Sequence, residues 1–424
     1  MPTQHRDQQP ADGHTPESIN ASQDAARPRS GRLETAGLFG GSALLLVLGF
    51  WLAGQFVQPA PPRTITMAAG QPDGAYMRYA RRYRQALAVH GITLELEETQ
   101  GSVDNLGRLL RAEDPVDLAL VQGGIATPEQ REQLSGLGSM FYEPLWLVMP
   151  AAAPTRTLND LDGMRIAIGP EGSGTRRLVL QLLSLNGIDA DTATLITQPA
   201  ATSAQDLLAD QLDLMLGVSA PDSPSLRELL ANPSVRLQTL PRADAYSRIN
   251  RALTRLTLPR GALSPAQDIP PRPLELVAPT ANLVARPDLH PALVDLLIDA
   301  ARQAHGGGSL LAEPGTFPTP RHTDFPLNPD AERHYEHGPP FLQRYLPFWA
   351  ATWIDRTKVM LVPMLALLLP LIKILPPVYA WRVRRRILRW YVELRRIDRE
   401  LETRSLGPEA LPALREGLAQ IESE

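Results

Sequence analysis

The sequence has 424 residues, a formal net charge of −4, 43% hydrophobic and 21% charged residues, and no cysteine. The missing cysteine excludes disulfides, thiolate metal sites and a cysteine nucleophile, and the slightly negative charge argues against nucleic acid as a partner. The length and composition predict a globular chain with two or three domains.

An apolar stretch without charge occupies residues 35–57 and predicts a transmembrane helix, because a spanning helix needs about 20 apolar residues. Three arginines between residues 27 and 32 precede it and place the N-terminus in the cytoplasm. Residues 1–34 are expected to be a disordered cytoplasmic tail. The stretch is long for a signal peptide and no A-x-A cleavage site follows it, which favours an uncleaved anchor.

Strands alternate with helices from residue 63 onward. The pattern predicts strands at 63–69, 92–98 and 116–122, with a helix after the first strand that ends at Gly91 and another that opens at Ser102 or Val103. This alternation predicts parallel sheet built from βαβ units.

The pattern restarts after 144–150. A strand at Met164–Ile168 leads through a glycine-rich loop into a helix over 175–186, and further strands and helices follow as far as Ser219. We therefore expect two α/β units, with ligand-binding turns at the carboxyl ends of the strands.

The glycine-rich loop reads IAIGPEGSGTRR over 166–177. Gly169 and Gly174 have P-loop spacing, but Thr175 stands where the phosphate-binding lysine would be, and no G-x-G-x-x-G fingerprint is present. What remains is a helix N-terminus whose free N–H groups and dipole favour an anion. The alternative is that Ser173 or Thr175 only caps the helix.

Four stretches together resemble the TAXI family of solute-binding proteins of TRAP (tripartite ATP-independent periplasmic) transporters. They are MAAGQPDGAYMRYA, ETQGSVDNLGRLLRAEDPVDLALVQ, DLDGMRIAIGPEGSGTRRLVLQLLSLNGID and LDLMLGVSAPDSPSLRELL, within about residues 64–305. The resemblance implies an α/β, two-lobed periplasmic-binding-protein-like (type II) fold that closes on a small organic anion, a carboxylate or an amino acid such as glutamate, without catalysis. Lobe one is expected to comprise 63–148 with 256–305, and lobe two 149–255.

The same resemblance implies the ligand-binding residues. They are Gly74, Tyr76, Ser102, Asn105, Gln122, Glu143, Gly172, Ser173, Gly174, Thr175 and Ser219. Two family positions differ here, because Ala75 replaces a small hydroxyl residue and Met77 an aromatic one. Glu143 is expected either to accept an ammonium group or to anchor the hinge, and the turns at Ser102 and Ser173 to grip one anion from opposite lobes.

Four segments follow the lobes. Residues 306–340, rich in glycine and proline, predict a linker, and residues 341–356 predict an interfacial aromatic segment. Residues 357–381 predict a second transmembrane helix, and the arginines of the helical tail 382–424 place that tail in the cytoplasm beside anionic lipids.

The sequence thus predicts a binding domain held outside the inner membrane by two spans, with a TRAP-type permease and membrane lipids as partners and with no cofactor or metal. A ligand sensor that signals through 382–424 is the alternative, although a flexible linker would weaken such signalling. An enzyme is disfavoured, because no nucleophile elbow G-x-S-x-G occurs.

Overall fold

The computed structural model describes residues 59–403 and a few isolated positions on either side of that range. Residues 59–353 form one compact unit, and the two terminal parts of the chain are grouped in another. The predicted tail 1–34 and most of the predicted span 35–57 lie outside the described residues.

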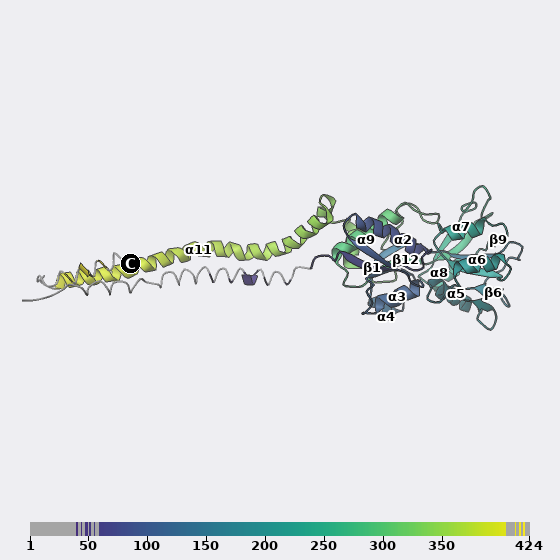
Figure 1. The fold of residues 1–424 in the computed structure, drawn as a ribbon, viewed down its shortest axis with the longest axis horizontal. Helices are drawn as coiled ribbons and strands as arrows, with labels where there is room; N and C mark the ends of the chain where they lie inside the picture. The colour runs from purple at the N-terminus through teal and green to yellow at the C-terminus, as the bar shows by residue number, and fades with distance from the viewer. Residues whose placement is uncertain are drawn as a thin grey trace, which may run out of the picture. The chain divides into compact units, whose positions relative to one another are not determined.

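The first lobe, which contains the strands labelled β1 and β12 in Figure 1, is built on a five-stranded mixed sheet in the order β2-β1-β3-β12-β4. The strands β1, β2 and β3 are parallel, whereas β12 runs antiparallel to both β3 and β4. Their bounds are β1 Thr64–Ala68, β2 Thr93–Glu97, β3 Leu118–Gln122, β4 Ser135–Tyr142 and β12 Thr280–Ala285. The predicted βαβ arrangement is confirmed for the first three strands.

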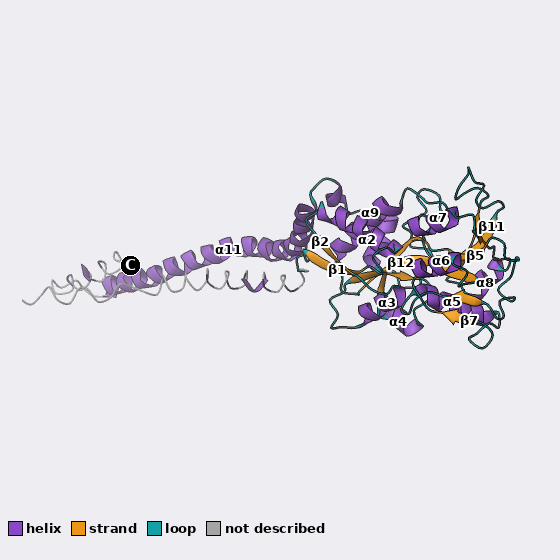
Figure 2. Cartoon of the chain, turned by 45° about the vertical axis from the view of Figure 1, so that its right-hand side comes forward, coloured by secondary structure: helices purple, strands orange, loops and turns teal. Residues whose placement is uncertain are grey.

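Helices cover both faces of this sheet, and each face has its own core. The helices α2 (Ala75–Ala88) and α9 (Pro291–His305) bury one face, where Tyr83 and Leu297 are fully enclosed. The helix α3 (Ser102–Leu110) buries the other face through Leu106 and Leu109. Figure 2 shows α3 on the opposite side of the strands from α2 and α9. A short helix, α4 (Pro128–Glu132), follows β3.

The second lobe repeats the plan of the first. Its sheet has the order β7-β6-β8-β5-β9, in which β6, β7 and β8 are parallel and β5 runs antiparallel to β8 and β9. The bounds are β5 Leu145–Pro150, β6 Arg165–Ala167, β7 Thr194–Ile196, β8 Leu214–Val218 and β9 Val235–Leu237, and the helices are α5 Gly174–Leu185, α6 Ala200–Leu208, α7 Pro224–Ala231 and α8 Ala243–Ile249. Two α/β lobes with mixed sheets, as in periplasmic binding proteins, are therefore confirmed.

The boundary between the lobes differs from the prediction. Residues 256–278 were expected in lobe one, but the antiparallel pair β10 (Thr254–Leu258) and β11 (Leu274–Ala278) packs into the second lobe, where Leu258 and Leu276 share a core with Trp146. The chain crosses between the sheets near residues 143/144 and 278/279. Lobe 1 is hereafter 59–143 with 279–353, and lobe 2 is 144–278.

The predicted linker 306–340 is packed on the folded lobes, so the prediction of a linker is wrong as to its structure. Leu310 and Leu311 pack against the core of lobe 2, and the later part of the segment follows lobe 1. Thr319 and Leu327 form bridges to the edge strand β4, and the helix α10 (Pro329–His337) packs on α9. The hydroxyl of Tyr335 donates a 2.9 Å hydrogen bond to the carbonyl of Leu137. Although this segment is rich in glycine and proline, it follows the edge of the sheet, because its backbone N–H and C=O groups form hydrogen bonds with β4 there.

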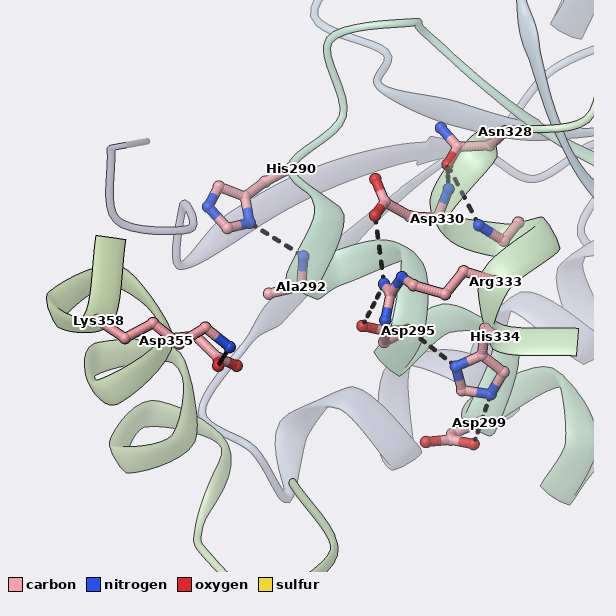
Figure 3. A network of polar contacts seen from close by, with 11 residues as sticks. His290, Ala292, Asp295, Asp299, Asn328, Asp330, Arg333, His334, Asp355 and Lys358 are labelled. Carbon is pink, nitrogen blue, oxygen red and sulfur yellow. Dashed lines mark hydrogen bonds and ion pairs between the residues drawn. The ribbon is translucent and has the colours of Figure 1, made fainter. Parts of the chain in front are cut away.

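Figure 3 shows the polar contacts that fix α10 to α9. His334 is 0% exposed, and its Nδ1 lies 2.8 Å from a carboxylate oxygen of Asp295. Its Nε2 lies 3.3 Å from a carboxylate oxygen of Asp299. This distance allows an ion pair, but the geometry is not that of a hydrogen bond. Burial opposes the charged imidazole, but the two carboxylates outweigh it and raise the pKa of His334 above its ordinary value.

The C-terminal part contains a 3-10 turn, η1 (Phe341–Arg344), and one long helix, α11 (Phe348–Thr403). The predicted interfacial segment 341–356 exposes the aromatic rings of Phe341, Tyr345 and Trp353 and buries Phe348. In the part of the chain that the structure describes, no helix has both the length and the apolar character needed to cross a membrane. Neither predicted span is confirmed, and residues 404–424 lie almost entirely outside the described range.

Candidate functional site

Lobe 1 contributes a group of buried polar side chains at the ends of its strands. Ser102 begins α3 after Gly101, whose φ of 126° suits glycine. The Ser102 hydroxyl accepts a hydrogen bond from the backbone N–H of Gln122, the last residue of β3, and lies 3.2 Å from the Tyr76 hydroxyl at the start of α2. The parallel strands thus bring together Tyr76, Ser102 and Gln122, three of the predicted site residues.

Glu143 extends this group to the crossing point between the lobes. The Tyr76 hydroxyl donates a 2.9 Å hydrogen bond to the Glu143 carboxylate, which belongs to a residue only 4% exposed. Burial raises the pKa of Glu143 to about 8, and the hydrogen bond from Tyr76 only partly opposes this rise. The carboxyl group is therefore largely protonated at neutral pH in this conformation.

Gln122 also reaches across to lobe 2. Its side-chain Nε2 donates a 3.1 Å hydrogen bond to the carbonyl of Gly174, the first residue of α5. A Cβ at position 174 would lie 2.5 Å from Oε1 of Gln122, closer than real Cβ contacts come. Glycine at 174 therefore allows the N-terminus of α5 to meet lobe 1 directly.

The two turns predicted to grip an anion are in contact with each other. The carbonyl of Gly172 accepts hydrogen bonds from the N–H groups of Val103 at 3.0 Å and Asp104 at 3.3 Å. The turns do come from opposite lobes, as predicted, but the protein's own backbone fills the space between them. An anion held between these two turns therefore has no room in this closed conformation, which corrects the predicted clamp.

Ser173 acts as the N-cap of α5 in this conformation. Its hydroxyl accepts from the backbone N–H of Arg176 at 3.2 Å and donates to the carbonyl of Pro170 at 2.6 Å. The capping alternative raised by the sequence is thus the one that the structure shows for Ser173.

A small cavity of about 110 Å³ lies in lobe 2 beside these turns, at the carboxyl ends of β6, β7 and β8. Ligands in parallel α/β sheets bind at such strand ends. Thr175 and Ser219, two predicted site residues, line it. Its other polar side chains are Gln198, Ser203, Ser223 and Ser225, and its apolar side chains include Trp146, Met215 and Leu226. All lining residues are uncharged.

Three helix N-termini converge on this cavity. Thr175 is in the first turn of α5, Ala200 and Ala201 open α6, and Ser223 and Ser225 flank the first residue of α7. First-turn N–H groups have no partner within their own helix, and each helix dipole adds positive potential at this end. A neutral cavity surrounded in this way favours an anionic group.

Two predicted site residues have structural roles instead. Asn105 is 0% exposed, and its side-chain amide donates to the carbonyl of Leu120 at 2.8 Å and accepts from the Thr99 hydroxyl. Gly74 closes the turn before α2, with its N–H 2.9 Å from the carbonyl of Gln71. Both residues stabilise the lobe 1 turns through these hydrogen bonds.

Sequence reasoning missed three serines of the cavity, Ser203, Ser223 and Ser225, and an ion pair that joins the lobes. Arg78 on α2 donates to Asp222 before α7 at 2.8 Å. A sequence signal existed for the serines, since Ser223-Pro224 directly follows a strand and turn, as is typical of a helix start. Nothing in the sequence paired Arg78 with Asp222.

A larger cavity of about 830 Å³ lies elsewhere, between the end of α2, α9 and the segment before α11. Lobe 1 alone lines it, and none of the predicted site residues contributes, whereas Thr175 and Ser219 line the smaller cavity. We place the candidate site in the smaller cavity for these reasons. Across the described residues, no cluster of three or more histidine or acidic side chains is arranged to hold a metal ion.

Comparison with solved structures found weak likenesses to binding proteins. The alkanesulfonate-binding protein SsuA of Xanthomonas axonopodis pv. citri, bound to MOPS, is 18% identical, covers 59% of this chain and 75% of its own, and gives a TM-score of 0.39. SsuA of Escherichia coli is 16% identical with a TM-score of 0.38, covering 58% and 74%. A mutant of ArgBP from T. maritima is 13% identical with a TM-score of 0.37, covering 58% and 92%. Scores of this size support no conclusion about the ligand.

The family comparison is more informative. No curated protein matches the sequence, but the model of the NMT1-like family matches residues 67–301, which is more than half of the chain. This range includes every predicted site residue, the cavity and both crossing points. The chain therefore belongs to the NMT1-like family, which is of the periplasmic solute-binding type.

Proposed function

We propose that this chain is a TAXI-like, extracytoplasmic solute-binding protein. It binds a small organic anion, a carboxylate or an amino acid, and delivers it to a TRAP-type permease. The convergence of three helix N-termini on one uncharged cavity supports this function best. Oriented backbone N–H groups bind an anion without a cationic side chain, and the apolar wall formed by Trp146 and Leu226 suits a carbon skeleton.

Binding requires the lobes to separate and close again. The bonds from Gln122 to Gly174 and from Val103 to Gly172 hold the lobes together beside the cavity. A solute enters when these bonds open, and closure then removes it from water. Binding and closure are thus one linked equilibrium.

A thermal-shift screen of the full-length chain, purified in a mild detergent, tests the binding function. A solute at 100 times its dissociation constant should add about 2.7 kcal/mol to the free energy of unfolding. Carboxylates and amino acids are expected to do so, whereas neutral sugars are not. A screen in which no organic anion stabilises the chain would refute the proposal.

A charge placed inside the cavity tests its location. Ala201 lines the cavity in the first turn of α6, so Ala201→Asp should fill the site with the protein's own carboxylate and weaken solute binding more than tenfold. Thr202→Asp is the matched control, because Thr202 is exposed in the same helical turn but does not line the cavity. Equal affinities of the two variants would place the solute elsewhere.

We propose further that residues 35–57 and 357–381 anchor the protein in the inner membrane, with the binding lobes outside and both termini in the cytoplasm. The apolar sequences and the following arginines support this topology. Protease treatment of spheroplasts should degrade the lobes but spare a tag fused to residue 424. Deletion of a neighbouring permease gene should abolish uptake of the same solute.

A ligand sensor is a second candidate, and one observation favours it. Residues 319–340 are packed on lobe 1, and Phe348, the first residue of α11, is buried in the lobe 1 core. A loose linker therefore does not separate lobe 1 from the start of this helix. If the chain is a sensor, residues 382–424 should capture a cytoplasmic protein and be dispensable for solute binding.

A further inference from the structure

The larger cavity of lobe 1 has a mostly apolar wall. Its volume of about 830 Å³ lies within the usual range of ligand-binding pockets. The apolar side chains that line it are Val89, Leu296, Leu346, Pro347, Phe348 and Trp349. Val89 directly follows α2 and is 82% exposed, so part of this apolar wall is in contact with solvent. A wall of this composition suits a hydrocarbon chain.

Two arginines at the cavity have no close acidic partner. Arg302 lines the cavity, and within the described residues its side chain makes no hydrogen bond and only one ion-pair contact, to Asp299 at 3.7 Å. Asp299 also faces the buried His334 imidazole at 3.3 Å, which compensates its charge from inside the lobe (Figure 3). The exposed Arg63 lies 5.2 Å over the ring of Trp349. Guanidinium groups of this kind suit a phosphate.

Lobe 1 carries both connections to the proposed membrane spans. Pro59 follows the first proposed span, and its carbonyl lies 3.1 Å from the imidazole of His290 at the start of α9. Phe348 lines the cavity, and residue 357, where the second proposed span begins, is nine positions further along the chain. Nine residues reach at most about 30 Å even when fully extended. In the proposed topology, chain length alone therefore keeps this cavity close to the membrane.

Exposed aromatic rings flank the lining residues in the sequence. Phe341, Tyr345 and Trp353 are 71%, 74% and 64% exposed, and the rings of Phe341 and Tyr345 lie 5.1 Å apart between centroids. Aromatic side chains are enriched where proteins meet lipid headgroups. The apolar wall, the arginines, the short tether and these rings together fit one occupant, a phospholipid with a net negative headgroup.

We propose that the lobe 1 cavity binds an anionic phospholipid of the membrane, whose acyl chain lies along the apolar wall and whose phosphate pairs with Arg302. This inference rests on the membrane anchoring proposed above and goes beyond it. A lipid bound here holds lobe 1 at the bilayer surface and leaves lobe 2 free to open and close. Free phosphate lacks the chain that fills the apolar part, so it does not occupy the site.

Photo-crosslinking of the full-length chain in nanodiscs tests the site. The probe is phosphatidylglycerol with a diazirine in one acyl chain, and mass spectrometry locates the labelled peptides. Besides the spans, peptides that contain Leu296 or Trp349 should be labelled. Phosphatidylcholine with the same diazirine, which has no net charge, should label these two peptides about fivefold less. Excess inorganic phosphate should not compete with either lipid.

Two matched pairs of variants locate the bound lipid. Val89→Glu places a carboxylate at the cavity and should remove the lobe 1 labels, whereas Ile249→Glu makes a similar change at an exposed helix end of lobe 2 and should keep them. Arg302→Gln should reduce the lobe 1 labels about fivefold, as expected for one basic side chain beside an anionic lipid. Arg248→Gln also removes an arginine paired with an aspartate of its own helix, and it should change nothing.

The outcomes separate this inference from the proposed topology. Labels confined to residues 35–57 and 357–381, or equal labelling of lobe 1 in Val89→Glu and Ile249→Glu, would overturn the lipid site and leave the membrane topology intact. Equal labelling of lobe 1 by the two lipids would also overturn it. Labels in neither the spans nor lobe 1 would overturn the topology as well. All four variants should keep the thermal shift with solute, because none of them changes the lobe 2 cavity.

Discussion

The two lobes share one strand plan but bury different kinds of polar side chains. Among the described residues, every buried aspartate, glutamate and histidine lies in lobe 1: Glu143, Asp295, His305 and His334. The buried polar side chains of lobe 2 are neutral, namely Ser203, Ser223 and Gln238. Lobe 2 thus offers backbone dipoles that do not titrate, whereas lobe 1 offers groups whose charge depends on pH. We therefore expect pH to act on this protein mainly through lobe 1.

The largest expected effect is the pH dependence of stability at Glu143. Its pKa is about 8 in the folded chain and about 4.5 when unfolded, so its stabilising contribution is complete below about pH 4.5 and is lost as the pH rises through 8. The free energy of unfolding should fall by about 3–5 kcal/mol over this range. Urea denaturation of Glu143→Gln should lack this fall, while Glu98→Gln should retain it. A Glu143→Gln curve parallel to the wild type would contradict the assignment.

The next effect tests the close approach of the lobes. In Gly174→Ala the new Cβ meets the buried Gln122 side chain only when the lobes are closed. Overpacking of this kind costs about 1–3 kcal/mol, so the solute identified in the screen should bind about 10- to 100-fold more weakly, with little change in melting temperature. Gly107→Ala is the control, because no atom lies within 4 Å of a Cβ there. Unchanged affinity in Gly174→Ala would show that solute binding does not need this contact.

A smaller effect concerns the contact between α9 and α10. The pKa of His334 is raised, so its ion pairs with Asp295 and Asp299 stabilise the fold fully below about pH 6.5, and this contribution is lost as the pH rises through the folded-state pKa. His334→Gln should lose about 1.5–3 kcal/mol of unfolding free energy at pH 6 and less at pH 9. His337→Gln, at an exposed position on the same helix, should behave like the wild type. An equal loss at both pH values would exclude a charged imidazole.

The smallest effect is expected at the ion pair between the lobes. Arg78 and Asp222 are partly exposed, with side chains 23% and 38% accessible, and such pairs contribute about 0.2–1 kcal/mol. Asp222→Asn should therefore weaken solute binding less than about fivefold, and only at low salt. Asp244→Asn removes an ion pair of lobe 2 that does not reach lobe 1 and should leave affinity unchanged. A loss above tenfold in Asp222→Asn would give this pair a direct role in holding the solute.

Local patterns in the sequence predicted much of the fold. The alternation of apolar strands with helices gave both α/β lobes, and the glycine turns marked the strand ends where the candidate site lies. Segment 306–340 was misjudged because its glycines and prolines are typical of a linker, yet Thr319 and Leu327 pair with β4. Such pairing between residues almost 200 positions apart leaves no local signal.

The sequence by itself determined which residues are placed at strand ends, because hydrophobic periodicity and turn residues act within a few positions. Only the tertiary structure decided what those residues touch. It joined the turns at Ser102 and Gly172 by direct hydrogen bonds, assigned β10 and β11 to lobe 2, and gathered three helix N-termini around one cavity. The physical reason is that closure, burial and the pKa of Glu143 depend on contacts between segments far apart in the chain.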